Sequence, residues 1–311
     1  MRKHRRCNTP AACAQGSFEM PAASPEITGL RIASQAQHII RAAFTPDPDD
    51  AFAWWAIATD RVRVANCTFQ LSPRHIHEIN QACIQEELDI GAISSAAWPL
   101  LYKNYKILSA GASVGRGYGP ALVTKSSDQL KLGAGAIVAI PGAQTTGALL
   151  LRLFFPGVRT VELPFDQIAA AVHRGDADAG VLIHEELLNW RATGLHRLAC
   201  LGERWMQETG MPIPVGLNVI HRRLGDDLIA RISAAIRESM IRANQDCVEA
   251  RAWAMRYSRQ AQAGIADEFI RMFANDDTLQ LGDDCLAALR KLYAMAYERG
   301  LIPSIPPVET V

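Results

Sequence analysis

The sequence lacks the features that mark several large classes of protein. It has no net charge, because 32 lysines and arginines balance 32 aspartates and glutamates, and this balance argues against nucleic acid as a partner. No apolar run approaches the roughly 20 residues of a membrane-spanning helix, so we expect no membrane partner. The seven cysteines are scattered without a C-x-x-C pair, which argues against a zinc site or a disulfide framework and is typical of a reducing cytosol.

The first 36 residues lack both apolar periodicity and a hydrophobic segment of the secretory type. They are rich in Ala, Pro, Ser, Gln and Gly and begin with a basic cluster, Arg2 to Arg6. Such a segment buries too little apolar surface to offset the entropy of ordering. We therefore expect residues 1–36 to form a disordered extension without a signal peptide, and the protein to act in the cytoplasm. Met20 is an alternative translation start.

From residue 37 onward, short apolar runs alternate with amphipathic segments. The patterns predict strands over 39–44, 67–71, 88–93, 121–124, 137–140, 160–163, 179–183 and 215–220. They predict helices over 51–59, 147–154, 165–173, 185–192, 228–257 and 283–299, with shorter ones after Pro73 and Ser95. This alternation is typical of mainly parallel sheets that helices cover on both faces.

A glycine-rich segment divides the alternating pattern into two blocks. Gly111 to Gly119 is followed by Pro120 and a strand rather than a helix, so it predicts a mobile loop or an interdomain crossover and not a nucleotide-binding loop. The length suits two domains. We expect an α/β protein with an interlobe cleft, in which residues 37–122 and 217–311 form the first lobe and residues 123–216 the second.

Four polar clusters follow predicted strands. They are Thr45-Pro-Asp-Pro-Asp-Asp50, Ser94-Ser95, Thr145-Thr146 and His184-Glu185-Glu186. Ligands of open α/β sheets collect at this edge, so we expect one site in the cleft, with two clusters from each lobe. His184 is its candidate base, although a semi-buried structural histidine or a helix cap fits the position equally well.

Hydroxyl groups at two of these clusters precede helices. Thr145 and Thr146 open an apolar helix, and its N–H groups together with the hydroxyls can bind a carboxylate or a phosphate. Helix capping by the same hydroxyls is compatible with that role. Ser94 and Ser95 allow the same two interpretations.

The remaining acids and histidines are weak candidates for a metal site. Asp47, Asp49 and Asp50 lack partner histidines nearby, and we expect Asp49 or Asp50 to cap the following helix. His75 and His77 lie two residues apart on a predicted helix and therefore point to different sides. We accordingly expect no metal and no cofactor.

Five segments, in order, resemble the 1,4-dihydroxy-6-naphthoate synthases of the futalosine route to menaquinone. They are Thr45-Pro-Asp-Pro-Asp-Asp-Ala-Phe52, Ala92-Ile-Ser-Ser-Ala-Ala-Trp-Pro99, Leu108-Ser-Ala-Gly-Ala-Ser-Val-Gly-Arg-Gly-Tyr-Gly-Pro120, Ile140-Pro-Gly-Ala-Gln-Thr-Thr146 and Leu182-Ile-His-Glu-Glu186. The resemblance continues through Gly216–Ile220 and Met272–Thr278, and so covers roughly residues 38–304. The chain departs from the family in having Arg116 where an acid is common, and Ser95-Ala96-Ala97 where aromatic or histidine residues are frequent.

The resemblance implies a fold, a reaction and a set of site residues. The family has the two-lobed type 2 periplasmic-binding-protein fold and converts cyclic dehypoxanthine futalosine to 1,4-dihydroxy-6-naphthoate and dihydroxyacetone without a cofactor. His184 would be the proton acceptor, and the substrate-binding set would comprise Ser94, Ser95, Thr145, Thr146, Asp47 and Asp50. Two alternatives stay open, namely a chorismate dehydratase-like paralogue and a non-catalytic solute-binding protein of the same fold.

Overall fold

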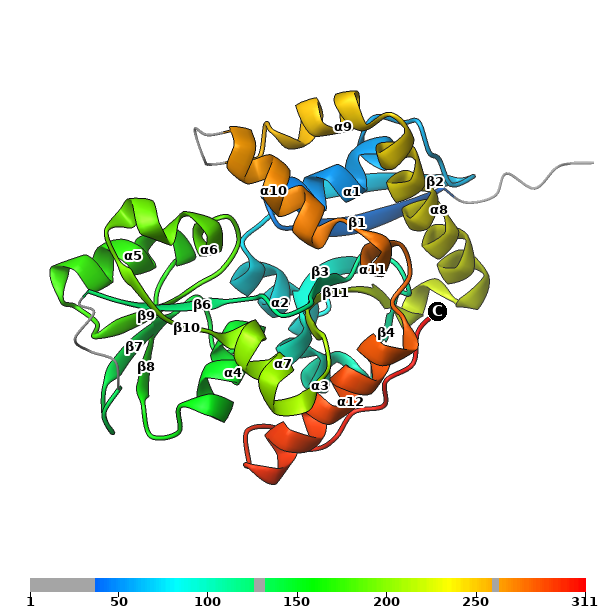
Figure 1. Ribbon diagram of the computed structural model, residues 1–311. Coiled ribbons are helices and arrows are strands. Elements are labelled where there is room, and N and C mark those ends of the chain that lie inside the picture. The colour runs from blue at the N-terminus through cyan, green and yellow to red at the C-terminus, as the bar shows by residue number, and fades with distance from the viewer. Residues whose placement is uncertain (1–36, 126–131, 259–262) are drawn as a thin grey trace, which may run out of the picture. The chain divides into compact units, whose positions relative to one another are not determined.

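Two β-sheets carry the fold of this chain, which a computed structural model describes over residues 37–125, 132–258 and 263–311 (Figure 1). The strand order of the first sheet is β2-β1-β3-β11-β4, with β5 beside β11, and that of the second is β10-β6-β9-β7-β8. Residues 37–311 form one compact unit. The expected extension, residues 1–36, lies outside the described residues.

The first sheet draws its strands from two distant parts of the chain. These are β1 (His38–Phe44), β2 (Cys67–Pro73), β3 (Ile90–Ser94), β4 (Tyr105–Ile107), β5 (Ser113–Gly115) and β11 (Ile213–His221). The second sheet is formed by the intervening segment. Its strands are β6 (Ala121–Thr124), β7 (Ile137–Ile140), β8 (Arg159–Glu162), β9 (Ala179–Leu182) and β10 (His196–Cys200).

The two sheets are only partly parallel. The pairs β1–β2, β1–β3, β7–β8 and β7–β9 are parallel, as the alternating pattern predicts. Strand β11 pairs antiparallel with β3, β4 and β5, and β6 pairs antiparallel with β9 and β10. The expectation of mainly parallel sheets is therefore wrong for these strands, of which β6 is where the chain enters the second sheet and β11 is where it returns to the first.

Helices cover both sheets (Figure 1). Those of the first half are α1 (Pro48–Ala58), α2 (Ile76–Ile84), the 3₁₀ turn η1 (Ser95–Ala97), α3 (Trp98–Leu101), α4 (Thr146–Phe154) and α5 (Phe165–Arg174). They are followed by α6 (Glu186–Asn189), η2 (Trp190–Thr193), α7 (Leu201–Thr209), η3 (Arg222–Leu224), α8 (Asp226–Gln245), α9 (Cys247–Ala254), α10 (Ala263–Phe273), α11 (Asp276–Leu279) and α12 (Asp283–Glu298). Helix α1 packs against α8, α9 and α10.

One hydrophobic core contains residues from both sheets. It joins Ile93 and Val114 of the first sheet to Val138 and Val181 of the second, with Leu150 of α4 among them. A separate core under α1 buries Trp54 and Trp55. The sheets thus pack as parts of one α/β fold, while the lobe boundaries at 122/123 and 216/217 stay a prediction.

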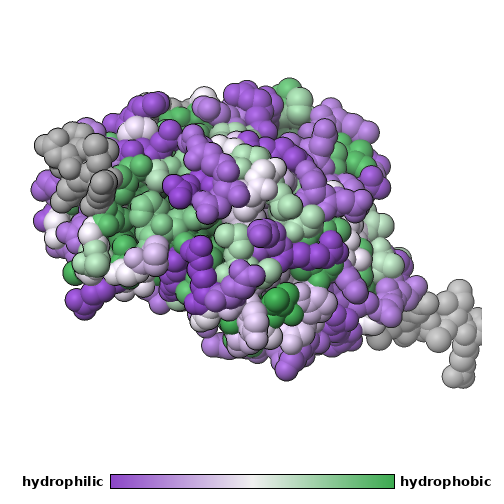
Figure 2. Space-filling view, turned by 60° about the horizontal axis from the view of Figure 1, so that its bottom comes forward, coloured by the Kyte–Doolittle hydropathy of each residue, from purple (hydrophilic) through white to green (hydrophobic). Residues whose placement is uncertain are grey.

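Polar and charged side chains cover most of the face in Figure 2, with apolar side chains in small groups between them. Exposed large apolar residues are few in the described segments and include Ile39, Leu100 and Val248. No helix of the described segments has the length and apolar character needed to cross a membrane.

The start of α1 differs from the expected one. The helix begins at Pro48, so Asp49 and Asp50 lie in its first turn and Asp47 occupies the N-cap position without a capping hydrogen bond from its side chain. The predicted cap at Asp49 or Asp50 is therefore wrong. Proline fits the first helical turn, where it needs no hydrogen-bond donor, and Asp47 faces His184 instead of the helix.

Gly111 lies where no larger residue fits. Its φ of +93° is in the left-handed region, and a Cβ atom there would lie 1.9 Å from Nδ2 of the buried Asn218. Its N–H donates to the carbonyl of Thr278 at 2.7 Å. This close approach fixes the segment that enters the pocket described below.

Gly111→Ala should lower the free energy of unfolding by about 2–4 kcal/mol, because backbone strain and overpacking add. Gly117→Ala is the matched control, since Gly117 has a φ of +83° but no atom within 4 Å of the added Cβ, and it should cost about 1 kcal/mol. Urea unfolding measures both values. Equal losses would contradict a steric role for Asn218.

Candidate functional site

A pocket between the two sheets collects all four of the predicted polar clusters. It has about 680 Å³ of empty space, part of it open to solvent. Its polar lining consists of Thr45, Asp47, Asp49, Asp50, Ser94, Ser113, Thr145, Thr146 and His184. Ser95 lies just outside this lining, and its hydroxyl is buried without a hydrogen-bond partner among the described residues.

His184 lies in the turn between β9 and α6. Its φ of +55° is in the left-handed region, which histidine adopts more often than most residues other than glycine. Its ring packs edge to face on Phe165 of α5, with 4.8 Å between centroids. The turn thereby directs the ring into the pocket, where 14% of the side chain is exposed.

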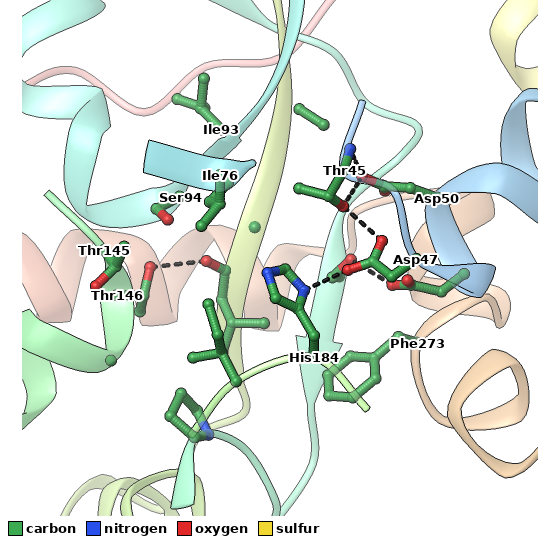
Figure 3. Close-up of a pocket in the computed structure, with 18 of the residues that line it drawn as sticks. Thr45, Asp47, Asp50, Ile76, Ile93, Ser94, Thr145, Thr146, His184 and Phe273 are labelled. Atoms are coloured by element: carbon green, nitrogen blue, oxygen red, sulfur yellow. Dashed lines mark hydrogen bonds and ion pairs between the residues drawn. The ribbon is translucent and has the colours of Figure 1, made fainter. Parts of the chain in front are cut away.

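The ring of His184 forms an ion pair with Asp47 through Nδ1 (Figure 3). Asp47 follows β1 of the first sheet, whereas His184 follows β9 of the second. Burial raises the pKa of Asp47, but the charge and hydrogen bond of His184 outweigh burial and hold that pKa below its usual value. In Figure 3 the second ring nitrogen is turned away from Asp47, toward the side of the pocket with Ser94 and Thr146.

Two further acids and one hydroxyl surround Asp47. The Thr45 hydroxyl lies 2.6 Å from Asp47 Oδ1 and 2.5 Å from Asp50 Oδ2. Burial, followed by the charge of Asp47, raises the pKa of Asp50 to about 6. Burial and the charges of Asp47 and Asp50 raise the pKa of Asp49 well above its usual value. The negative charge of this cluster is therefore concentrated on Asp47.

Helix α4 begins at the opposite wall of the pocket. The Thr145 hydroxyl caps it by accepting from the N–H of Ala148 at 3.3 Å, as the sequence predicts. The Thr146 hydroxyl donates to the carbonyl of Val215 at 2.7 Å and accepts from the N–H of Ala96 at 3.3 Å. The N–H groups of the first turn have no carbonyl partner within the helix, so this wall is suited to bind an anionic or carbonyl oxygen.

His75 and His77 do not share a ligand site. His75 precedes α2 and packs on Phe165 at 5.1 Å between ring centroids, whereas His77 faces Glu162 at 3.8 Å. Over the residues that the structure describes, no group of three His, Cys, Asp or Glu side chains is arranged to hold a metal ion.

Sequence patterns did not predict the apolar wall of the pocket. Phe269 and Phe273 of α10 line it, and Phe273 lies beside His184 in Figure 3. The resemblance over Met272–Thr278 was the one signal for this segment. Arg116 is not among the lining residues, because its guanidinium pairs with Asp277 and Asp284. Arg116, which stands where the family commonly has an acid, therefore changes a contact that lies outside the pocket.

Comparisons with known proteins agree on one family. The model of a family described as "Menaquinone biosynthesis" matches residues 40–298. A 1,4-dihydroxy-6-naphthoate synthase from Streptomyces coelicolor is 34% identical over 275 residues, which cover 86% of this chain and 96% of the relative. A synthase of the same name from Thermus thermophilus is 30% identical over 269 residues, covering 86% and 97%.

Solved structures agree with the two-lobed fold. The crystal structure of a protein from Archaeoglobus fulgidus has a TM-score of 0.80 and 40% identity, and covers 85% of this chain and 98% of that one. The alkanesulfonate-binding protein SsuA from Xanthomonas axonopodis has a TM-score of 0.65 at 12% identity, covering 87% and 96%. At that identity the likeness shows the fold alone, which is of the periplasmic-binding-protein type.

The raised pKa of Asp50 makes a prediction about stability. An acid whose pKa rises from 3.8 to about 6 on folding binds its proton more tightly in the folded chain, so its contribution to stability falls as pH rises through that window. Asparagine does not titrate, so Asp50→Asn removes this fall in stability with rising pH. Between pH 4 and pH 7 the unfolding free energy of D50N should therefore shift by ~2 kcal/mol in its favour relative to the parent. A difference that is constant across this range would contradict the shift.

Proposed function

The chain belongs to the menaquinone-biosynthesis family, and on that premise we propose that it is a 1,4-dihydroxy-6-naphthoate synthase. Its substrate would be cyclic dehypoxanthine futalosine, which it would cleave at a carbon–carbon bond to give 1,4-dihydroxy-6-naphthoate and dihydroxyacetone. The observation that carries the proposal is the His184–Asp47 ion pair in a pocket between the two sheets. We further propose that this cofactor-independent lyase acts in the cytoplasm.

His184 is the proposed general base. Abstraction of a proton from carbon beside a carbonyl requires a base that is neutral at working pH, and the unperturbed pKa of histidine, about 6.5, meets that need. Because Asp47 accepts from Nδ1, the neutral ring carries its hydrogen on Nδ1 and presents the lone pair of Nε2 to the substrate. Asp47 also stabilises the imidazolium that forms when the proton is transferred.

The α4 wall is the proposed site for the oxygen atoms of the substrate. Proton abstraction places negative charge on a carbonyl oxygen, which donors fixed in advance stabilise. Thr145 and Thr146 supply a helix N-terminus, and Ser94 supplies a hydroxyl from the end of β3. Ser95, with its buried hydroxyl, remains in the proposed binding set as a neighbour of this wall.

We assign a different role to the two acids that the sequence places among the substrate-binding residues. Asp47 is already paired with His184, and Asp50 contacts the hydroxyl and the backbone N–H of Thr45. A carboxylate held in this way is suited to orient the base rather than to bind an anionic substrate. The apolar wall with Phe269 and Phe273 lowers the local dielectric constant of the pocket, which strengthens each of these electrostatic contacts.

His184→Gln should lower turnover of cyclic dehypoxanthine futalosine by about 10²- to 10⁴-fold, the usual contribution of a positioned general base. His77→Gln is the matched control, because His77 lies outside the pocket lining, and it should retain parental turnover. Formation of the naphthoate measures both rates. Parental turnover by H184Q, or dehydration of chorismate in place of this reaction, would contradict the proposal.

Thr146→Val should weaken binding of 1,4-dihydroxy-6-naphthoate by about 1–3 kcal/mol, because a buried oxygen of the ligand loses a hydroxyl that turns from the carbonyl of Val215 to donate to it. Thr146→Ser keeps the hydroxyl and should bind as the parent does. Isothermal titration calorimetry gives both affinities, and thermal unfolding checks that T146V, which loses the hydrogen bonds to Val215 and Ala96, still folds. Equal affinities of T146V and T146S would remove Thr146 from the binding site.

A further inference from the structure

The hydroxyl of Thr45 lies between two buried carboxyl groups. Its Oγ is 2.6 Å from Asp47 Oδ1 and 2.5 Å from Asp50 Oδ2, and all three residues are buried. A threonine hydroxyl has one hydrogen and therefore donates to one acceptor. The second of these short contacts is a hydrogen bond only where its carboxyl group is protonated and its O–H donates to Thr45 Oγ.

Asp50 is the acid that fits the role of donor. Asp47 carries the charge that pairs with His184, and its pKa lies below the usual value. The pKa of Asp50 is raised to about 6, first by burial and then by the charge of Asp47. The backbone N–H of Thr45 also donates to Asp50 Oδ2 at 2.9 Å, which fixes that oxygen beside the hydroxyl.

Asp49 closes the other side of Asp47. Its Oδ1 is buried and has no donor within the described residues, and its Oδ2 accepts from the Ser113 hydroxyl at 3.3 Å. Burial raises its pKa well above the usual value, and the neighbouring charges of Asp47 and Asp50 raise it further. The titratable groups that face Asp50 are thus Asp47, Asp49 and His184, while α10 contributes only phenylalanines to the pocket lining.

We propose that Thr45 and Asp50 are positioning residues that act on the base through Asp47. Asp50 donates to the Thr45 hydroxyl where it holds its proton, and it accepts from the backbone N–H of Thr45 where it is ionised. In both states Thr45 donates to Asp47, and Asp47 accepts from Nδ1 of His184. The inference rests on the proposed function, in which His184 is the base. This chain of hydrogen bonds fixes the carboxylate of Asp47, and a carboxylate free to rotate would let the imidazole ring move away from the substrate.

Thr45→Val tests the chain because it removes the hydroxyl and keeps the shape, whereas Thr45→Ser keeps the hydroxyl. In the full-length protein, T45V should lower kcat by about 10- to 100-fold, the cost of a misplaced catalytic group, and leave KM within a few-fold of the parent. T45S should restore kcat. In Asp50→Asn the amide oxygen accepts from the Thr45 N–H but has no proton to donate to Oγ. Since the Thr45 hydroxyl can still donate to Asp47, kcat should fall by less than in T45V.

The decisive comparison combines T45V with Asp47→Asn. If Thr45 acts through Asp47, T45V should lower the kcat of D47N by less than about threefold, since residues of one network are not additive. Three results would overturn the proposal. They are losses of kcat from T45V and D47N that multiply in the double variant, a parental kcat in T45V, and a raised KM with an unchanged kcat in T45V. Thr45→Ala replaces T45V in the cycle if the valine variant does not fold. Parental turnover by H184Q would instead remove the proposed function itself, so the two failures are distinguishable.

Discussion

The ion pair between Asp47 and His184 is the interaction on which the site depends. It joins the segment after β1 to the turn after β9, and these strands belong to different sheets. The histidine backbone adopts a left-handed conformation to present its ring there, and such strain persists only where the surroundings impose it. The proposed base is thus oriented by a residue from the opposite sheet, so its geometry depends on how the two sheets pack.

Concentrating three acids in this place is costly, because each buried carboxylate loses the solvation of water. The chain limits that cost by leaving the charge on Asp47, where His184 offsets it, and by raising the pKa values of Asp49 and Asp50. Asp47 is therefore the one strong acceptor of this polar cluster, and it faces Nδ1 of His184. A base oriented in this way needs no rearrangement when the substrate enters, which is how preorganised sites lower a barrier.

Much of this arrangement could be predicted from the sequence, and the reasons for the rest are physical. Apolar runs located β1, β3, β7 and β9, and the rule that ligands collect at strand ends located His184 and Thr146. Periodicity reports burial but not strand direction, so β6 and β11 were located while their antiparallel direction was missed. The pairing of Asp47 with His184 spans the two sheets, and no local pattern encodes such a contact. No helix was predicted over α10, and nothing local placed Phe273 in the pocket.

The tautomer of His184 tests the central claim most directly. Nitrogen-15 chemical shifts of its imidazole ring, followed across pH in the parent and in Asp47→Asn, report which nitrogen carries the hydrogen when the ring is neutral. We expect the neutral parent ring to carry it on Nδ1, and the D47N ring to lose that preference. A neutral ring with its hydrogen on Nε2, or shifts that D47N leaves unchanged, would contradict the account.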